Sequence, residues 1–125
     1  MKLALCLLLM LASTAATAQP EAKDFPRAAT DFLGQELPQM EAAIKVSDRA
    51  YFVSATTRMK NFLEGWGLSG DAVALEQFPM CTEAVTDFVI VGFCKISPPG
   101  AICDPETFFP KFERNLLRCR SAAGV

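Results

Sequence analysis

The spacing of the cysteines constrains this chain more than any other feature of its sequence. Four of the five cysteines follow the pattern Cys81-x12-Cys94-x8-Cys103-x15-Cys119, and the fifth, Cys6, lies near the start. An even number of cysteines in a short exported chain is typical of a disulfide framework, whereas cysteines in a cytosolic enzyme more often bind a metal or take part in catalysis. The first question is therefore whether the chain is exported.

The first 18 residues have the organisation of a signal peptide. A charged start is followed by an apolar centre over residues 3–12 and by Ala-Thr-Ala at 16–18, which fits the small-residue cleavage site. The apolar centre is shorter than the ~20 residues that span a bilayer. We therefore expect an exported mature chain that begins at Gln19, lacks Cys6 and contains no membrane span. The absence of an Asn-x-Ser/Thr sequence favours the periplasm of a bacterium over a eukaryotic secretory route, and an extracellular location is the alternative.

The mature chain, residues 19–125, is expected to form a single, mostly helical domain, with a loose arm at 19–26 and a frayed tail at 121–125. A short helical pattern begins at Thr30, and Pro38 is expected to open a new helix because proline suits the first helical turn. Residues 38–64 then form either one long helix or two helices with a restart at Ser47-Asp48. The apolar residues that carry this helical spacing are Met40, Ile44, Tyr51, Ala55, Met59, Phe62 and Trp66.

A glycine-rich segment, Gly65-Trp66-Gly67-Leu68-Ser69-Gly70, follows that pattern. It matches the dinucleotide-binding sequence G-x-G-x-x-G, but in a nucleotide site this sequence follows a strand and opens a helix. Here it follows the clearest helical pattern of the chain, so it predicts a helix end and a loop. A short helix is then expected from Asp71 to Gln77, ended by Pro79.

Residues 83–96 are apolar nearly all round, which fits a buried helix or a buried strand. Their β-branched content favours a strand, while their length and a possible cap at Thr82 favour a helix, and we expect the helix. A turn at 97–100 leads to a last helix, capped by Asp104 with Pro105 in its first turn. Its apolar face consists of Phe108, Phe109, Phe112, Leu116 and Leu117, and Pro110 is expected to kink or delay it.

Helix geometry limits how the four cysteines can pair. In continuous helices Cys81 and Cys94 would lie ~20 Å apart, and Cys103 and Cys119 ~24 Å apart. A disulfide needs Cα atoms within ~7 Å, so consecutive pairing is excluded and a helical hairpin favours the nested pairs Cys81–Cys119 and Cys94–Cys103. If residues 83–96 formed a strand, consecutive pairing of the cysteines would again be possible, as in cystatin-like β-hairpin domains. The fold prediction is a small bundle of four or five helices with a disulfide-stapled C-terminal helical hairpin.

The composition excludes several chemistries. The chain contains no histidine, which removes histidine-based triads, histidine general bases and imidazole metal ligands. It has no C-x-x-C pair for redox chemistry and no cysteine knuckle for zinc, and its net charge of −2 argues against a nucleic-acid binder. Glu83 and Asp87 lie four residues apart and could form a paired acid site, but acidic residues near a helix start are usually structural. We therefore expect no catalytic residues, no cofactor and no metal.

The predicted function is that of an exported, non-enzymatic binding protein that acts on another protein, such as an inhibitor of, or immunity factor against, a secreted enzyme. Candidate partner contacts are the aromatic residues Tyr51 and Trp66 and a basic stripe on the last helix, Lys111, Arg114 and Arg118. An alternative is a carrier of an apolar small molecule or lipid in a helical shell, because the chain has ten phenylalanines. An enzyme that uses carboxylates is the third possibility.

Overall fold

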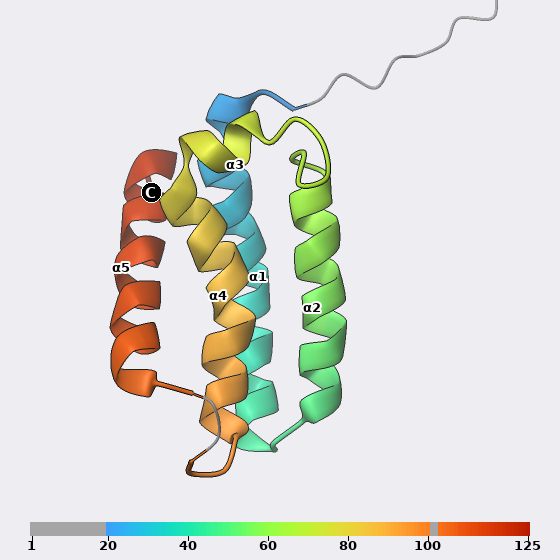
Figure 1. Cartoon of the computed structure of the whole chain (residues 1–125), viewed down its shortest axis with the longest axis vertical. Coiled ribbons are helices and arrows are strands. Elements are labelled where there is room, and N and C mark those ends of the chain that lie inside the picture. The colour runs from blue at the N-terminus through green and yellow to red at the C-terminus, as the bar shows by residue number, and fades with distance from the viewer. Residues whose placement is uncertain (1–19, 101–102) are drawn as a thin grey trace, which may run out of the picture.

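The computed structural model describes residues 20–100 and 103–125. Within these ranges the chain contains helices and no strand, so the predicted helical bundle is confirmed (Figure 1). None of the described helices is long and apolar enough to cross a membrane. The signal peptide and cleavage site predicted at 1–18 lie outside the described residues. The elements are the 3-10 helix η1 (Ala22–Asp24) and the helices α1 (Phe25–Lys45), α2 (Arg49–Glu64), α3 (Val73–Gln77), α4 (Pro79–Ile96) and α5 (Pro105–Ala123).

Helix α4 lies at the centre of the bundle. It packs against α1, and this pair is flanked by α5 on one side and by α2 on the other (Figure 1). The short helix α3 crosses one end of the bundle next to η1. Because α4 has neighbours on several sides, its side chains are apolar nearly all round, which explains why residues 83–96 lack the one-sided pattern of a surface helix.

Aromatic side chains fill the space between α1, α2 and α4. Phe32 stacks on Phe62 with ring centroids 4.6 Å apart, and the ring of Phe88 meets that of Phe32 edge-on, with centroids 5.8 Å apart. Phe25 and Phe88 are fully buried. Most of the phenylalanines that could have lined a ligand cavity therefore serve as core, which is their usual role.

Residues 22–26 of the arm predicted at 19–26 are helical and not loose. They form η1 and the start of α1, and Phe25 is fully buried with its ring 5.1 Å from that of Trp66. Pro26 sits in the first turn of α1, where the missing N–H costs nothing because the first N–H groups of a helix have no intrahelical acceptor. The helix start predicted at Thr30 is therefore too late.

Helix α1 also runs through Pro38, where the sequence predicts a new helix. An internal proline removes one helical hydrogen bond, but Leu33 and Met40 on either side are buried in the core, and their packing keeps the helix continuous. The break comes instead at residues 46–48. There the side chain of Asp48 accepts hydrogen bonds from the backbone N–H groups of Ala50 (3.0 Å) and Tyr51 (3.3 Å), which confirms the alternative of two helices.

Helix α4 begins at Pro79, earlier than predicted, and the strand alternative for residues 83–96 is wrong. Thr82 is not a cap, because it lies inside α4 and its hydroxyl donates to the backbone oxygen of Leu75 at 2.9 Å. Helix α5 begins as predicted, with the side chain of Asp104 accepting from the N–H of Thr107 at 3.3 Å.

The remainder of α5 departs from the prediction in two ways. Pro110 lies within α5 and does not delay its start. The helix extends to Ala123 and ends at Gly124, whose φ of 76° is the left-handed conformation typical of a helix end. Residues 121–123 of the predicted frayed tail are therefore helical, and the N–H groups of Gly124 and Val125 donate to the backbone oxygens of Ser121 and Arg120.

Candidate functional site

The two disulfides have the nested pairing predicted from the sequence. Cys81 is bonded to Cys119 with Cα atoms 4.8 Å apart, and Cys94 to Cys103 with Cα atoms 5.7 Å apart. They join α4 to α5 at one end of this helical hairpin and to the loop before α5 at the other. Both disulfides belong to the scaffold, because every cysteine that the structure describes is consumed in them.

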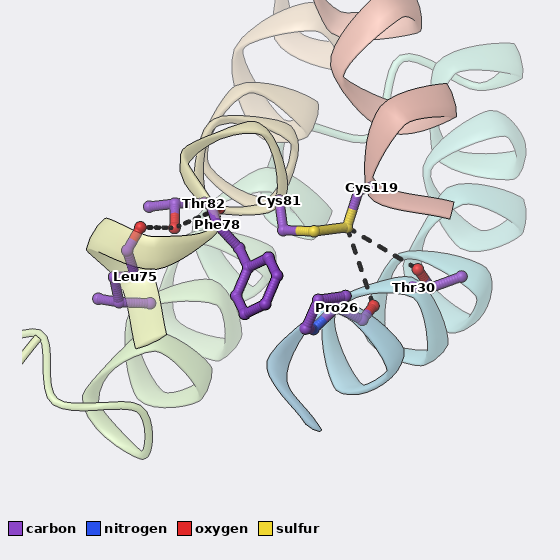
Figure 2. Close-up of a disulfide and its surroundings, with 7 residues drawn as sticks. All are labelled: Pro26, Thr30, Leu75, Phe78, Cys81, Thr82 and Cys119. Carbon is purple, nitrogen blue, oxygen red and sulfur yellow. Dashed lines mark hydrogen bonds between the residues drawn. A yellow bond between two sulfur atoms is a disulfide. The ribbon is translucent and has the colours of Figure 1, made fainter. Parts of the chain in front are cut away.

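The Cys81–Cys119 disulfide also contacts α1 (Figure 2). The sulfur of Cys119 lies 3.8 Å from both the hydroxyl of Thr30 and the backbone oxygen of Pro26. A disulfide sulfur carries no hydrogen, so Thr30 is the only possible donor of the two. Cys81 and Cys119 are fully buried, and the disulfide therefore forms part of the core where three helices meet.

The predicted carboxylate pair lies between α4 and α5. The ammonium nitrogen of Lys111 is 3.3 Å from both Glu83 Oε2 and Asp87 Oδ2, and Asn115 donates to Glu83 Oε2 at 2.7 Å. Asp87 is largely buried, and its Oδ2 has this ion pair but receives no well-directed hydrogen bond from the described residues. The carboxylates, Glu83 foremost, raise the pKa of Lys111. Through these contacts both acids hold α5 against α4.

The basic stripe on α5 is divided by these contacts. Lys111 points to the carboxylates of α4, whereas Arg114 and Arg118 are exposed. The two arginines stay predictions as partner contacts, and α5, which carries them, lies on the far side of the bundle from α2 (Figure 1).

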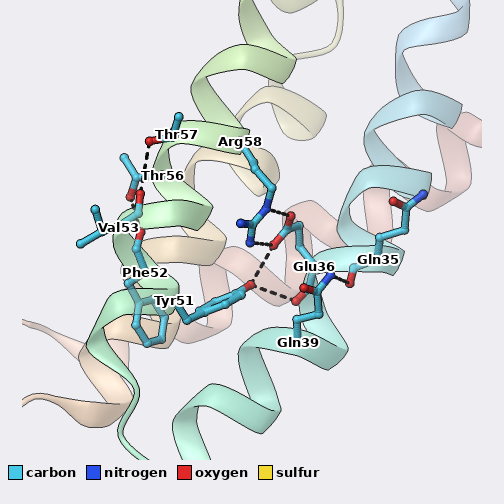
Figure 3. A network of polar contacts seen from close by, with 9 residues as sticks. All are labelled: Gln35, Glu36, Gln39, Tyr51, Phe52, Val53, Thr56, Thr57 and Arg58. Carbon is cyan, nitrogen blue, oxygen red and sulfur yellow. Dashed lines mark hydrogen bonds and ion pairs between the residues drawn. The ribbon is translucent and has the colours of Figure 1, made fainter.

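Tyr51 belongs to a buried polar network that ties α2 to α1 (Figure 3). Its hydroxyl donates to Glu36 Oε2 at 2.8 Å, and Arg58 binds the same carboxylate through two nitrogens, at 2.5 and 2.9 Å. Glu36 is only 4% exposed. The hydrogen bond from Arg58 lowers the pKa of Glu36 against the opposing effect of burial, and burial together with the neighbouring carboxylate raises the pKa of Tyr51. The phenol stays protonated and serves as a donor inside the bundle.

Trp66 lies at the opposite end of α2 from Tyr51, next to the glycine segment. Its ring packs on those of Phe25 and Phe62 and borders a hollow of 240 Å³ between η1 and α3. The glycine segment is a helix end and loop, as predicted. Gly67 has a φ of 96° and leaves no room for a β-carbon beside the backbone of Asp71.

A groove between α2 and α4 is absent from the sequence predictions. It has a volume of 390 Å³ and is open to solvent. Val53 is 72% exposed in it, and Ile90 and Phe93 are both about two-fifths exposed, at 42% and 41%. We call it the α2–α4 groove, and its lining residues are Arg49, Phe52, Val53, Thr56, Val89, Ile90, Phe93 and Cys103.

Among the residues that the structure describes, Arg49 is the only charged one that lines the α2–α4 groove. Its guanidinium carbon lies 6.0 Å from the ring centroid of Phe93, and it forms no ion pair with any residue in 20–100 or 103–125. The sequence does contain a signal for this face. Arg49, Phe52, Val53 and Thr56 follow a helical spacing that lies beside the core-facing stripe of α2.

A third hollow, of 230 Å³, lies between α1, α4 and α5. Its floor is apolar and its rim is charged. It is lined by Leu37, Met40, Glu41, Val91, Lys95, Phe109, Phe112, Glu113 and Leu116.

Similarity to other proteins and metal-ligand geometry add no further site. No protein-family model matches the chain, and comparison with curated proteins and with solved structures also gives no match. Across residues 20–100 and 103–125 there is no group of three or more Cys, Asp or Glu side chains placed to hold a metal ion.

Proposed function

We propose that this chain is an exported, non-enzymatic binding protein that acts on another protein, and that it contacts this protein through the α2–α4 groove. The observation that carries the proposal is the exposure of three large apolar side chains, Val53, Ile90 and Phe93, around one open hollow. Single exposed apolar residues are normal, whereas a group of them on one face is typical of an interaction site.

The scaffold supports this proposal. One disulfide joins α4 to α5 and the other joins α4 to the loop before α5, and disulfides persist in oxidising compartments outside the cytosol. A braced bundle presents a preformed surface, so little conformational entropy is lost on binding. We propose the bacterial periplasm as the compartment and a secreted enzyme as the kind of target that such a small inhibitor or immunity factor would bind.

A non-enzymatic role fits the carboxylates better than catalysis does. Glu83 and Asp87 share the ammonium of Lys111, and Glu36 is bound by Arg58 and Tyr51. Each of these acids therefore has an intramolecular partner, which is the arrangement of structural ion pairs. An acid that works as a general base needs to reach a substrate proton instead.

Capture by matched variants tests the proposal. The oxidised mature protein, Ile90→Asp and Leu117→Asp would each be immobilised and exposed to periplasmic extract. Leu117 is the control because it is 63% exposed on α5, outside the groove. We expect one protein to be retained by the parent and by Leu117→Asp but lost with Ile90→Asp, and then to bind the parent when purified. Equal retention by all three proteins would contradict the proposal.

A carrier of an apolar small molecule is the second candidate function, and the hollow between α1, α4 and α5 favours it. This hollow has an apolar floor that includes Met40, Val91 and Phe112 and a charged rim, the arrangement that suits an amphiphile. Native mass spectrometry of gently purified protein would show an adduct if the hollow is loaded. Leu116→Trp, at a half-buried residue of the same lining, should remove that adduct, whereas an unchanged adduct would exclude this hollow as the site.

A further inference from the structure

We propose that the α2–α4 groove receives one amphipathic helix of the partner protein, and that this helix carries an acidic side chain at the end that meets Arg49. This inference rests on the proposed function and deepens it, because it names the chemistry of the partner's surface. Three observations carry it. They are the spacing of the groove residues, the lack of free hydrogen-bond donors on the uncharged ones, and the charge of Arg49, which has no ion-pair partner among the described residues.

The walls of the groove have the spacing of helix-packing ridges. On α2 they come from positions 49, 52, 53 and 56, and on α4 from positions 89, 90 and 93. Rows of side chains at three- and four-residue intervals are the ridges into which another helix packs. Inside the bundle α5 contacts both α1 and α4 (Figure 1), whereas Val53 on α2 is left 72% exposed by the described helices.

The groove offers its occupant almost no hydrogen bonds. The hydroxyl of Thr56 donates to the backbone oxygen of Phe52 at 2.8 Å, so its single donor is already used within α2. The neighbouring Thr57 hydroxyl donates to the backbone oxygen of Val53 at 3.4 Å. A polar face laid on this surface would lose water without gaining partners, and the occupant's face must therefore be apolar.

Arg49 gives the groove a direction. It is the first residue of α2, and together with Phe93 and Cys103 it marks one end of the groove. Its guanidinium rests on the ring of Phe93 without a carboxylate partner among the described residues. A guanidinium has five donors in a planar fork that fits a carboxylate, so an acidic side chain is the complement at this end. A fatty acid also combines a carboxylate with an apolar body, but the two-sided helical spacing of the walls favours a helix.

Display selection tests the inference even while the partner is unidentified. A library of helical peptides with a randomised face would be selected on the oxidised mature protein, with counter-selection on Ile90→Asp. We expect the enriched peptides to carry apolar residues at i, i+4 and i+7 and Asp or Glu at one end of that stripe. Arg49→Gln should weaken such peptides about fivefold, as expected for one partly exposed ion pair. Arg49→Glu should shift the preference at that peptide position to Lys or Arg.

Each other outcome has a defined meaning. Enriched helices without a terminal acid, or with affinity unchanged by Arg49→Gln, would overturn the role of Arg49. Enrichment of no helix, together with shifts of the Val53 and Ile90 methyl NMR signals by dodecanoate, would replace the helix with a lipid carboxylate. Enrichment of no helix while an extract protein still requires Ile90 would overturn this inference and leave the proposed function standing. Enriched helices without any captured extract protein would support this inference about the groove and contradict the proposed function.

Discussion

Gly92 of α4 lies so close to Met40 of α1 that a β-carbon at position 92 would collide with the sulfur of Met40. The ring of Phe52 from α2 reaches the same point, 2.7 Å from such a β-carbon. Three helices therefore approach one another at a residue without a side chain. Because protein interiors are packed as densely as organic crystals, an added methyl group can enter only if the side chains of Met40 and Phe52 are displaced.

Substitution of Gly92 is expected to destabilise the bundle despite a gain in helix propensity. Gly92→Ala should lower the free energy of unfolding by about 1–3 kcal/mol through overpacking. Gly34→Ala is the matched control, since it is also helical but has nothing within 4 Å of the added carbon. It should raise the free energy of unfolding by about 0.5–1 kcal/mol. Urea titration measures both, and a stabilising Gly92→Ala would contradict the close approach.

The two disulfides are expected to contribute unequally to stability. Cys81–Cys119 closes a sequence separation of 38 residues and Cys94–Cys103 one of 9. The chain-entropy model gives about 4 kcal/mol for the longer loop and about 2.5 kcal/mol for the shorter one. Paired alanine substitutions, compared by urea unfolding, should show the larger loss for Cys81 with Cys119, which are also buried against α1. An equal or smaller loss for that pair would contradict this ranking.

The Glu36–Arg58 pair is expected to make stability depend on pH in the acid range. The pKa of Glu36 lies below its ordinary value of 4.5 because Arg58 donates hydrogen bonds to the carboxylate. The unfolded chain therefore binds the proton more readily, so the contribution is complete above about pH 5 and is lost as the pH falls through the lowered pKa. Glu36→Gln should remove this part of the pH dependence and cost about 2 kcal/mol at pH 7.

Thermal unfolding as a function of pH measures the Glu36 effect. Glu41→Gln provides the matched control, because Glu41 is an exposed glutamate on the same helix. It should leave the acid slope unchanged. An identical acid slope in the parent and in Glu36→Gln would show that other carboxylates are responsible.

Lys111→Met is expected to lower the free energy of unfolding more than replacement of both Lys111 and Asp87 does. It leaves Asp87, whose side chain is only 10% exposed, without the ammonium that now lies 3.3 Å away. A buried charge without its partner costs several kcal/mol, whereas an apolar or neutral replacement of both partners can be nearly neutral. We expect a loss of about 3 kcal/mol at pH 7 that Asp87→Asn restores in part. A double-mutant cycle measures this coupling, and strictly additive losses would contradict it.

The helices and their covalent links can be predicted from the sequence because they depend on local rules. Asp48 and Asp104 mark helix starts as capping residues do, and Gly65 and Gly67 mark a helix end. Helix length excludes consecutive pairing, since cysteines 13 or more residues apart in one helix cannot meet, and a helical hairpin then favours the nested pairs. The helix ends depend on local sequence alone, and the pairing requires in addition only that two helices joined by a short turn lie side by side.

The wrong predictions concern residues whose role depends on distant partners. Pro38 has the pattern of a helix start, but the burial of Leu33 and Met40 keeps α1 continuous across it. The arm at 19–26 has the composition of a loose segment, but Phe25 finds a site against Phe62 and Trp66 that forms only when α2 is in place. A local sequence pattern gives no information about a contact between residues that are 37 or more positions apart in the chain.

The same distinction applies to the candidate contact surface. Of the residues that the sequence singles out, Tyr51 and Lys111 are engaged in intramolecular networks, whereas Arg49, Val53 and Ile90 line the groove without standing out in the sequence. A tyrosine or lysine in a sequence gives no sign of whether its polar group is already satisfied. Only the position of Glu36 or Glu83 on another helix decides that.

Propensity, helix rise and composition are properties of the chain alone, and from them follow the helical fold, the exclusion of consecutive cysteine pairing and the lack of histidine chemistry. Which apolar side chains become core and which stay exposed depends on how the helices pack. Phe52 and Val53 are neighbours on α2, yet one is buried against Gly92 and the other is exposed in the α2–α4 groove. Burial is a relation between helices, and it exists only once they have packed.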